Sequence, residues 1–162
     1  MFKYLNISLV FLIVTRTVTL SSDYINSISK QHTFDYITIE DGLSNNLVTT
    51  ICTDAFGYVW FGTFDGVSRY DGYSISSYYS IKDDSTSLPG NTVFAMLLDS
   101  NGRFWLGTNG GLCYYDYNMD CFICVQFTLN NNVVDPFIGS LCEGKDGNLW
   151  IGTDIGLLVM NT

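Results

Sequence analysis

Histidine is almost absent from this chain, and basic residues are few. The sequence has 1 histidine, His32, and 7 lysines and arginines against 16 aspartates and glutamates, which gives a formal net charge of −9. Nucleic acid and anionic membrane surfaces are therefore unexpected partners, because both are negatively charged. The shortage of histidine and the lack of a recurring set of nucleophile, base and orienting group argue against a catalytic site.

The chain also lacks an even set of cysteines, because it has 5 of them and at least one cannot be paired within the chain. In an exported protein this argues against a full disulfide framework. Cys52 and Cys142 fall at the same place in a repeat and are predicted to be buried apolar residues. Cys121 and Cys124 have the spacing of a redox or metal motif, but on a strand they would point to opposite faces about 10 Å apart. We expect no metal and no cofactor, and a bridge from Cys113 to the neighbouring strand stays open.

No apolar run near the N-terminus is long enough to span a bilayer. The run from Ile7 to Val14 has 8 residues, with Lys3 before it and the small residues Ser21-Ser22 after it. This pattern predicts a cleaved signal peptide over residues 1–22, followed by a linker over 23–33. The expected location is the periplasm, without membrane binding after cleavage; an uncleaved anchor is the alternative.

What the sequence has in abundance is a repeat. Trp60, Trp105 and Trp150 are 45 residues apart, and each stands in the string Gly-x-x-Trp-x-Gly-Thr. This period falls within the range of four-stranded propeller blades. The composition, 47% hydrophobic and 15% aromatic, is typical of a folded domain.

Turn signals divide each repeat into strands. In the first repeat the turns are predicted at Asp54 to Gly57, Asp65-Gly66 and Asp71-Gly72, where aspartate caps the turn and glycine supplies positive φ. The tryptophan would fill one face of the second strand, and the glycine two residues later would let a neighbouring backbone approach. The aspartates and tryptophans are therefore predicted to hold the fold, although an exposed tryptophan could stack on a sugar.

The predicted fold is all-β, with three four-stranded antiparallel propeller blades that form an open arc from a truncated propeller. This partial propeller covers residues 34–162, with repeats over about 46–90, 91–135 and 136–162. The third repeat ends after its third strand, whereas Phe34 to Glu40 alternates in polarity and is predicted as a leading outer strand.

A ligand site is expected among the loops at one edge of the blades. Strand direction places the connections before each first strand and between each second and third strand on the same edge. The candidate ligand-binding residues there are Asn46, Phe64, Asp65, Asn91, Asn109 and Asp154. Amides, carboxylates and an aromatic ring suit the hydroxyls and ring faces of carbohydrates, and stabilisation of the turns is the alternative role.

The repeats resemble the two-component regulator propeller repeat, whose pattern is an asparagine and a short strand, Asp-x-x-Gly-x-Leu/Val-Trp-Ile/Phe-Gly-Thr, and Gly-Leu/Val-x-x-Tyr-Asp. The first repeat matches it at Asn46, Asp54, Gly57, Trp60, Gly62, Thr63, Gly66, Tyr70 and Asp71, and the second at Asn91, Asp99, Gly102, Trp105, Gly107, Thr108, Gly111, Tyr115 and Asp116. The third departs at its start, with Glu143-Gly144 where the aspartate would stand.

The resemblance implies the exported, ligand-sensing part of a hybrid two-component sensor histidine kinase of the Bacteroidota type, many of which respond to oligosaccharides. The implied partners are an oligosaccharide or other small ligand, and further blades and kinase modules in a longer chain; a homodimer is left open. This chain itself is not expected to be an enzyme. Two rival functions are a propeller enzyme, such as a lyase or quinoprotein, and a non-signalling surface scaffold.

Overall fold

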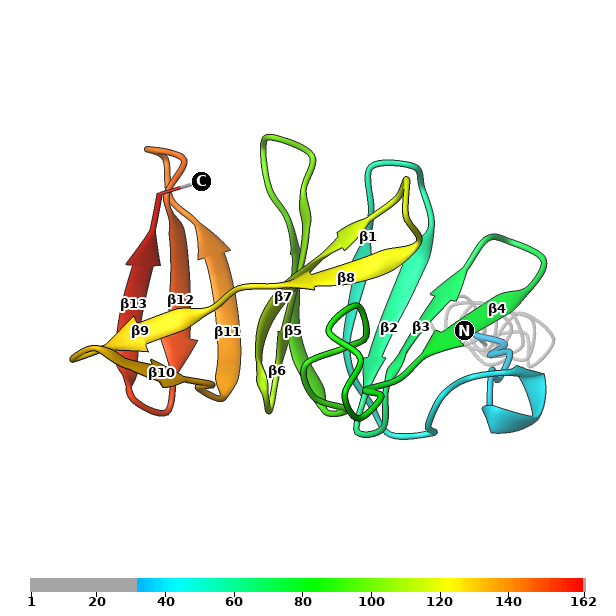
Figure 1. Cartoon of the computed structure of the whole chain (residues 1–162). Helices are drawn as coiled ribbons and strands as arrows, with labels where there is room; N and C mark the ends of the chain where they lie inside the picture. Colours follow the sequence, from blue (N-terminus) through cyan, green and yellow to red (C-terminus); the bar gives the residue numbers. More distant parts are fainter. Residues whose placement is uncertain (1–31, 162) are drawn as a thin grey trace, which may run out of the picture. The chain divides into compact units, whose positions relative to one another are not determined.

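The computed structural model describes residues 32–161, and no α-helix occurs among them. The predicted signal peptide over 1–22 and nearly all of the predicted linker over 23–33 lie outside the described residues. Residues 32–36 are exposed and have no regular secondary structure. Residues 37–161 belong to a compact unit of antiparallel sheets (Figure 1), to which the following description applies.

Two four-stranded sheets correspond to the first two repeats. The first sheet contains β1 (Val48–Thr53), β2 (Val59–Thr63), β3 (Val67–Tyr70) and β4 (Ile75–Tyr78), paired in that order. The second sheet contains β5 (Val93–Leu98), β6 (Phe104–Thr108), β7 (Gly111–Asp116) and β8 (Cys121–Cys124), paired in the same way. The strands predicted for these repeats are confirmed to within a few residues at their ends.

The third repeat forms a three-stranded sheet. It contains β11 (Ile138–Glu143), β12 (Leu149–Thr153) and β13 (Gly156–Met160). The prediction of three blades with four strands each is therefore met in two sheets, while the third has three strands among the described residues. The first strands adjoin one another, because β5 contacts β1 on one side and β11 on the other.

Aspartate shapes the turn between the first two strands in both four-stranded sheets. Asp54 Oδ1 accepts hydrogen bonds from the amides of Phe56 and Tyr58, at 2.9 and 3.0 Å, while its Oδ2 accepts from the indole of Trp60 at 2.7 Å. Gly57 closes this turn at φ 86°, a value that favours glycine. One buried carboxylate therefore joins the turn to the tryptophan beside it.

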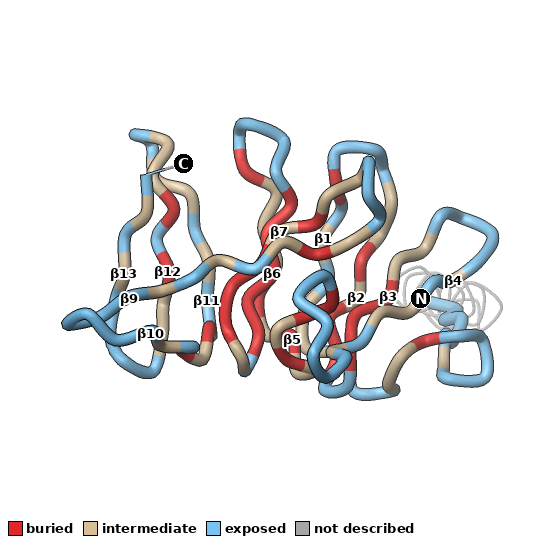
Figure 2. Tube along the Cα trace, viewed as in Figure 1, coloured by how far each residue is buried: buried red, intermediate tan, exposed pale blue. Residues whose placement is uncertain are grey.

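The hydrophobic core lies between successive sheets rather than within one sheet, and Figure 2 shows many buried residues on the strands of the second sheet. Trp60 is fully buried against Phe104 and Tyr115 of the second sheet, and its ring centroid lies 5.1 and 4.9 Å from theirs. Trp105 is 1% exposed and belongs to a second cluster with residues of the third sheet, including Leu149. Burial of these faces is what stacks the sheets.

The tryptophan and glycine two residues apart that recur in each repeat have a steric reason for their spacing. A Cβ on Gly62 would lie 3.0 Å from Cγ1 of Val93, and one on Gly107 would lie 2.5 Å from Cγ2 of Ile138. Val93 and Ile138 begin the first strands of the next sheets. The next sheet therefore approaches closely over this glycine at both junctions, with side-chain atoms at Gly62 and with both side-chain and backbone atoms at Gly107.

The predicted leading strand over Phe34 to Glu40 is wrong. Residues 32–38 have no regular secondary structure, and Ile39–Asp41 forms one turn of 3₁₀ helix, η1. Thr38 caps this turn, because its amide donates to Asp41 Oδ2 at 2.8 Å and its hydroxyl accepts from the amide of Glu40 at 3.2 Å. Such local side-chain bonds compete with strand pairing and here favour a turn.

The composition of the second repeat also predicts that its last strand runs from Cys121 to Phe127, and this prediction is wrong at its end. β8 stops at Cys124, and a hairpin of β9 (Phe127–Leu129) and β10 (Asn132–Val134) follows. Asn130 and Asn131 both have positive φ, 51° and 66°, as a two-residue hairpin turn requires. In Figure 1 this hairpin crosses the third sheet.

Trp150 differs from the other two tryptophans, and its predicted core position is wrong. It is 39% exposed, on the face of the third sheet that points away from the second. Gly144 stands where the carboxylate of the other repeats would accept the indole N–H. The preceding Glu143 instead accepts a hydrogen bond from the amide of Ser100 at 2.9 Å and so connects the second and third sheets.

Candidate functional site

The candidate site lies along one edge of the sheets, where each first strand begins and each second strand turns into the third. We call this edge the rim; it comprises residues 46–49, 63–67, 91–94, 108–111, 136–139 and 153–156. In an antiparallel sheet these segments share an edge, as the pairing of β1 with β2 shows. All six predicted ligand residues belong to the rim.

Hydrogen bonds join the rim of the first sheet to that of the second. The amide of Gly66 donates to the carbonyl of Asn91 at 2.6 Å, and the hydroxyl of Thr92 donates to the carbonyl of Phe64 at 3.1 Å. The structure therefore places Asn91 directly beside the turn that carries Phe64 and Asp65.

Two of the predicted polar residues hold the start of the first strand in their own sheet. Asn109 Oδ1 accepts from the amide of Thr92 at 3.1 Å, and Asp154 Oδ1 accepts from the amide of Phe137 at 3.0 Å. Asn109 and Asp154 are equivalent in the repeat, so this is a shared structural bond. The other carboxylate oxygen of Asp154, Oδ2, takes no part in this hydrogen bond.

Of the other polar candidates, two bind backbone amides and one faces solvent. Asn91 Oδ1 accepts from the amide of Ser80 at 2.6 Å, and Asn46 Oδ1 accepts from the amide of Ile39 at 3.0 Å. Asp65 is exposed at the tip of its turn. The carboxylate of Asp65 is therefore open to solvent, whereas the side chains of Asn46 and Asn91 hold backbone amides.

An aromatic row crosses the rim, with one ring from each repeat. Phe64 and Phe94 have ring centroids 5.9 Å apart, and Phe94 and Phe137 have centroids 4.7 Å apart. Phe64 is 49% exposed, while the other two rings are half-buried. Phe64 was predicted from the sequence, but Phe94 and Phe137 were missed.

A bulge positions the middle ring of this row. Each first strand has an irregularity in its pairing with the second, at residues 49, 94 and 139. Bulges re-aim side chains and occur often beside functional sites. Thr49 uses this position to donate a hydrogen bond to the carbonyl of Gly62 at 2.9 Å, whereas Phe94 uses it for ring contacts.

A hollow of about 490 Å³ opens next to Phe137, on the third sheet. Its lining consists of Phe137, Gly139, Ser140, Gly152, Thr153, Asp154, Gly156 and Leu157. Three of these residues are glycines, and the hydroxyls and the carboxylate give the hollow hydrogen-bonding groups. This lining combines an aromatic ring with polar groups, as sites for polyhydroxy ligands do.

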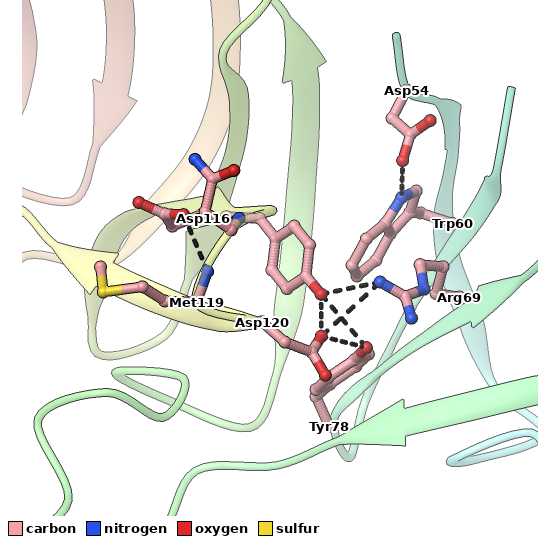
Figure 3. Close-up of polar contacts among 9 residues, drawn as sticks. Asp54, Trp60, Arg69, Tyr78, Asp116, Met119 and Asp120 are labelled. Atoms are coloured by element: carbon pink, nitrogen blue, oxygen red, sulfur yellow. Dashed lines mark hydrogen bonds and ion pairs between the residues drawn. The ribbon is translucent and has the colours of Figure 1, made fainter. Parts of the chain in front are cut away.

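A second polar cluster joins the first two sheets away from the rim (Figure 3). Arg69 Nη1 donates to the hydroxyl of Tyr115 at 2.7 Å and lies 3.6 Å from a carboxylate oxygen of Asp120. The hydroxyls of Tyr78 and Tyr115 both donate to that oxygen, the former at 3.0 Å. The guanidinium also stands 5.6 Å from the ring centroid of Trp60.

The environment of this Arg69 cluster shifts its acid groups in opposite directions. Burial, followed by the bond to Asp120, raises the pKa of Tyr115 well above its usual value. The hydroxyl of Tyr115, then that of Tyr78 and the charge of Arg69, lower the pKa of Asp120. These groups satisfy one another, so the cluster connects sheets rather than presenting free groups to a ligand.

All five cysteines are free, and the predicted burial of Cys52 and Cys142 is wrong, because Cys52 is half-buried and Cys142 is exposed. Cys113 is buried and stands opposite Cys124 in the pairing of β7 with β8, without a disulfide between them. Burial raises the pKa of Cys113 well above its usual value, which keeps the thiol protonated. Across residues 32–161, no group of three histidine, cysteine, aspartate or glutamate side chains is arranged to hold a metal.

The rim can bind through ring stacking and hydrogen bonds. It offers phenyl rings in a row, with the carboxylates of Asp65 and Asp154 near the row's two ends. The described part of the rim carries no histidine, lysine or arginine, so a general base of that kind is not available there. The described groups are of the kinds used for recognition, and they do not assemble a nucleophile with its base.

The family described as two component regulator propeller matches residues 42–65, 87–110 and 129–154. A solved extracellular domain assigned to a hybrid two-component system of B. thetaiotaomicron is similar, with 27% identity, a TM-score of 0.64, and coverage of 72% of this chain and 17% of that one. A second such domain from B. thetaiotaomicron has 24% identity and a TM-score of 0.67, with 82% and 19% covered, and supports the fold alone.

A curated relative, histidine kinase P4 of Formosa agariphila, is 40% identical over 55 residues, which is 34% of this chain and 4% of that protein. The chain thus spans less than a fifth of the length of each of these three proteins. Within residues 32–161, no helix is long and apolar enough to cross a membrane. From the matched segments and the shared fold, the chain contains repeats of the two-component regulator propeller family.

Proposed function

We propose that this chain is the periplasmic ligand-sensing part of a hybrid two-component signalling system. The observation that carries the proposal is the 27% identity and common fold with an extracellular domain assigned to such a system, together with the three matched repeats. In this role the chain is not an enzyme. It binds a ligand, and kinase modules in a longer chain respond to the change.

The ligand we propose is an oligosaccharide, bound at the rim. Phe64, exposed by 49%, and Asp65 provide a ring face and a carboxylate next to one another. Sugars present apolar ring faces and hydroxyls, which match these two kinds of group. The remaining candidates, Asn46, Asn91, Asn109 and Asp154, stay in the proposal as residues that shape the rim.

Isothermal titration with a panel of neutral and acidic oligosaccharides tests this function. We expect saturable binding of at least one sugar by the folded chain, with the sugar recovered unchanged. Conversion of the sugar would instead favour the propeller enzyme, and absence of binding together with capture of cell-surface proteins would favour the scaffold. The relay to a kinase is tested separately, by asking whether the bound sugar changes autophosphorylation of the longer protein.

A further inference from the structure

The aromatic row of Phe64, Phe94 and Phe137 is not a product of the repeat. The three residues occupy three different repeat positions. The equivalents of Phe64 are Asn109 and Asp154, those of Phe94 are Thr49 and Gly139, and those of Phe137 are Leu47 and Thr92. Each sheet forms the same strands and turns without a phenyl ring at the other two positions, so the fold does not require the row.

The three rings nevertheless meet. They come from the turn after β2, the bulge of β5 and the residue before β11, and successive centroids are 5.9 and 4.7 Å apart. Residues that the fold does require, such as Trp105 and Gly107, recur at the same place in every repeat. Three residues that do not recur therefore meet at one place, which the repeat itself does not dictate.

The row also depends on a small residue in the third sheet. A Cβ on Gly139 would lie 2.9 Å from Cε1 of Phe137, closer than side chains normally approach. The bulge position thus carries the ring of Phe94 in one sheet and leaves room for the ring of Phe137 in the next. This arrangement lets two rings from adjacent sheets lie in contact.

The charges beside the row restrict the ligand. At one end of the row, Asp65 is the residue after Phe64 in the sequence. At the other end, Asp154 accepts a hydrogen bond of 3.0 Å from the amide of Phe137. The whole chain carries a formal charge of −9. An anionic sugar would meet like charge at both ends of the row and lose affinity, whereas a neutral sugar would gain hydrogen-bond acceptors for its hydroxyls.

We infer that Phe64, Phe94 and Phe137 form one stacking surface for the ring faces of a neutral oligosaccharide. This inference rests on the proposed sensing function and adds to it the residues and the ligand class. The middle ring, Phe94, contacts both of its neighbours and is the residue on which the surface depends most.

Isothermal titration of the full chain with cello-, manno- and galacto-oligosaccharides, and with oligogalacturonate of matched length, tests the inference. We expect neutral sugars to bind and the uronate not to bind. Phe94→Leu should weaken binding about tenfold, because it removes the aromatic ring but keeps an apolar side chain. Tyr73→Leu, at a 98% exposed aromatic residue in the turn between β3 and β4 on the opposite edge, should leave affinity unchanged.

Gly139→Ala provides a second variant that keeps all three rings. Its added methyl group should displace the ring of Phe137 and weaken binding of the same sugar, while the melting temperature reports whether the fold is intact. Unchanged affinity in both Phe94→Leu and Gly139→Ala, or preference for the uronate, overturns the stacking surface but leaves the sensing function. If the wild type binds none of these sugars, the proposed ligand class fails, and the stacking surface fails with it.

Discussion

Trp105 and Trp150 occupy the same position in the repeat but have different surroundings. Trp105 is 1% exposed and donates its indole N–H to Asp99 at 2.8 Å, whereas Trp150 is 39% exposed and has Gly144 at the position of that aspartate. Burial and the acceptor, rather than the residue type, determine how much a tryptophan stabilises its sheet.

Trp105→Ala should therefore cost about 3–5 kcal/mol of unfolding free energy, because it opens a cavity between the second and third sheets. Trp150→Ala should cost less, about 1–2 kcal/mol, because 39% of that residue is already exposed and its indole lacks the buried carboxylate acceptor. Urea unfolding of both variants measures the difference. Equal losses would mean that Trp150 is covered in solution or that Trp105 is not.

Asp99, like its equivalent Asp54, should be a carboxylate whose loss strongly destabilises the fold. It is 5% exposed, and Oδ1 accepts hydrogen bonds from the amides of Asn101 and Arg103 at 3.0 and 2.8 Å in addition to the Trp105 indole on Oδ2. Asp99→Ala leaves these donors without their acceptor and should cost about 2–4 kcal/mol. Asp146→Ala, at the exposed turn of the third sheet, is the matched control and should lose less than about 1 kcal/mol.

At the scale of elements, the Arg69 cluster connects β3 and β4 to the hairpin of β7 and β8. The guanidinium lies over the rings of Tyr58, Trp60, Tyr78 and Tyr115, at 5.1 Å from the first and 5.6 Å from the others. Arg69→Lys keeps the charge but loses the planar group that stacks and donates to Tyr115. We expect a lower melting temperature for the lysine variant, and an unchanged value would show that charge alone suffices.

The same cluster should make stability depend on pH. The hydroxyl of Tyr115, then Tyr78 and Arg69, lower the pKa of Asp120 in the folded chain. A lowered pKa adds stability above the unfolded value of about 4 and loses it as the pH falls through the folded value. The melting temperature of wild type should therefore exceed that of Asp120→Asn at neutral pH, and the gap should close below about pH 4.

Asparagine is a suitable replacement in that test because residue 120 has a φ of 51°, a conformation that asparagine tolerates. A gap that is the same at neutral and acid pH would contradict a role for the carboxylate charge.

The strands within each repeat were predictable because their turns contain residues with a strong local preference, such as Gly57 at φ 86° and Gly102 at φ 82°. Two other elements were not predictable. The segment over 34–40 has the alternation of a strand, yet the Thr38 cap forms a turn. The hairpin at Asn130-Asn131 has a clear turn signal, but its segments are too short to stand out from β8.

The rim was only partly predictable from the sequence. Strand direction gave its position and placed Phe64 and Asn91 on one edge. Phe94 and Phe137 were not predicted, because each differs from its equivalents in the other repeats. Positions that recur in every repeat identify the fold, and these two residues do not recur. Their proximity depends on the bulge at residue 94 and on contact between sheets, neither of which sequence spacing reveals.

At the scale of the whole molecule, the third sheet presents an apolar face. Leu157 and Val159 are 65% and 50% exposed on the same face as Trp150. Burying such a face is favourable, so the chain studied alone should associate as its concentration rises. Light scattering should show a smaller apparent mass for the double variant Leu157→Ser, Val159→Ser than for wild type or for Tyr73→Ser; a monodisperse wild-type monomer at all concentrations would contradict this.

The central claim is that the chain senses a sugar at its rim, and amide chemical shifts during titration of the labelled chain with neutral oligosaccharides test it most directly. We predict that the largest shifts fall at residues 64–66, 91–94, 137–139 and 154, and that they saturate with the affinity measured by calorimetry. Shifts confined to the opposite edge, around Phe56 and Asn101, or the absence of any shift, would contradict the account.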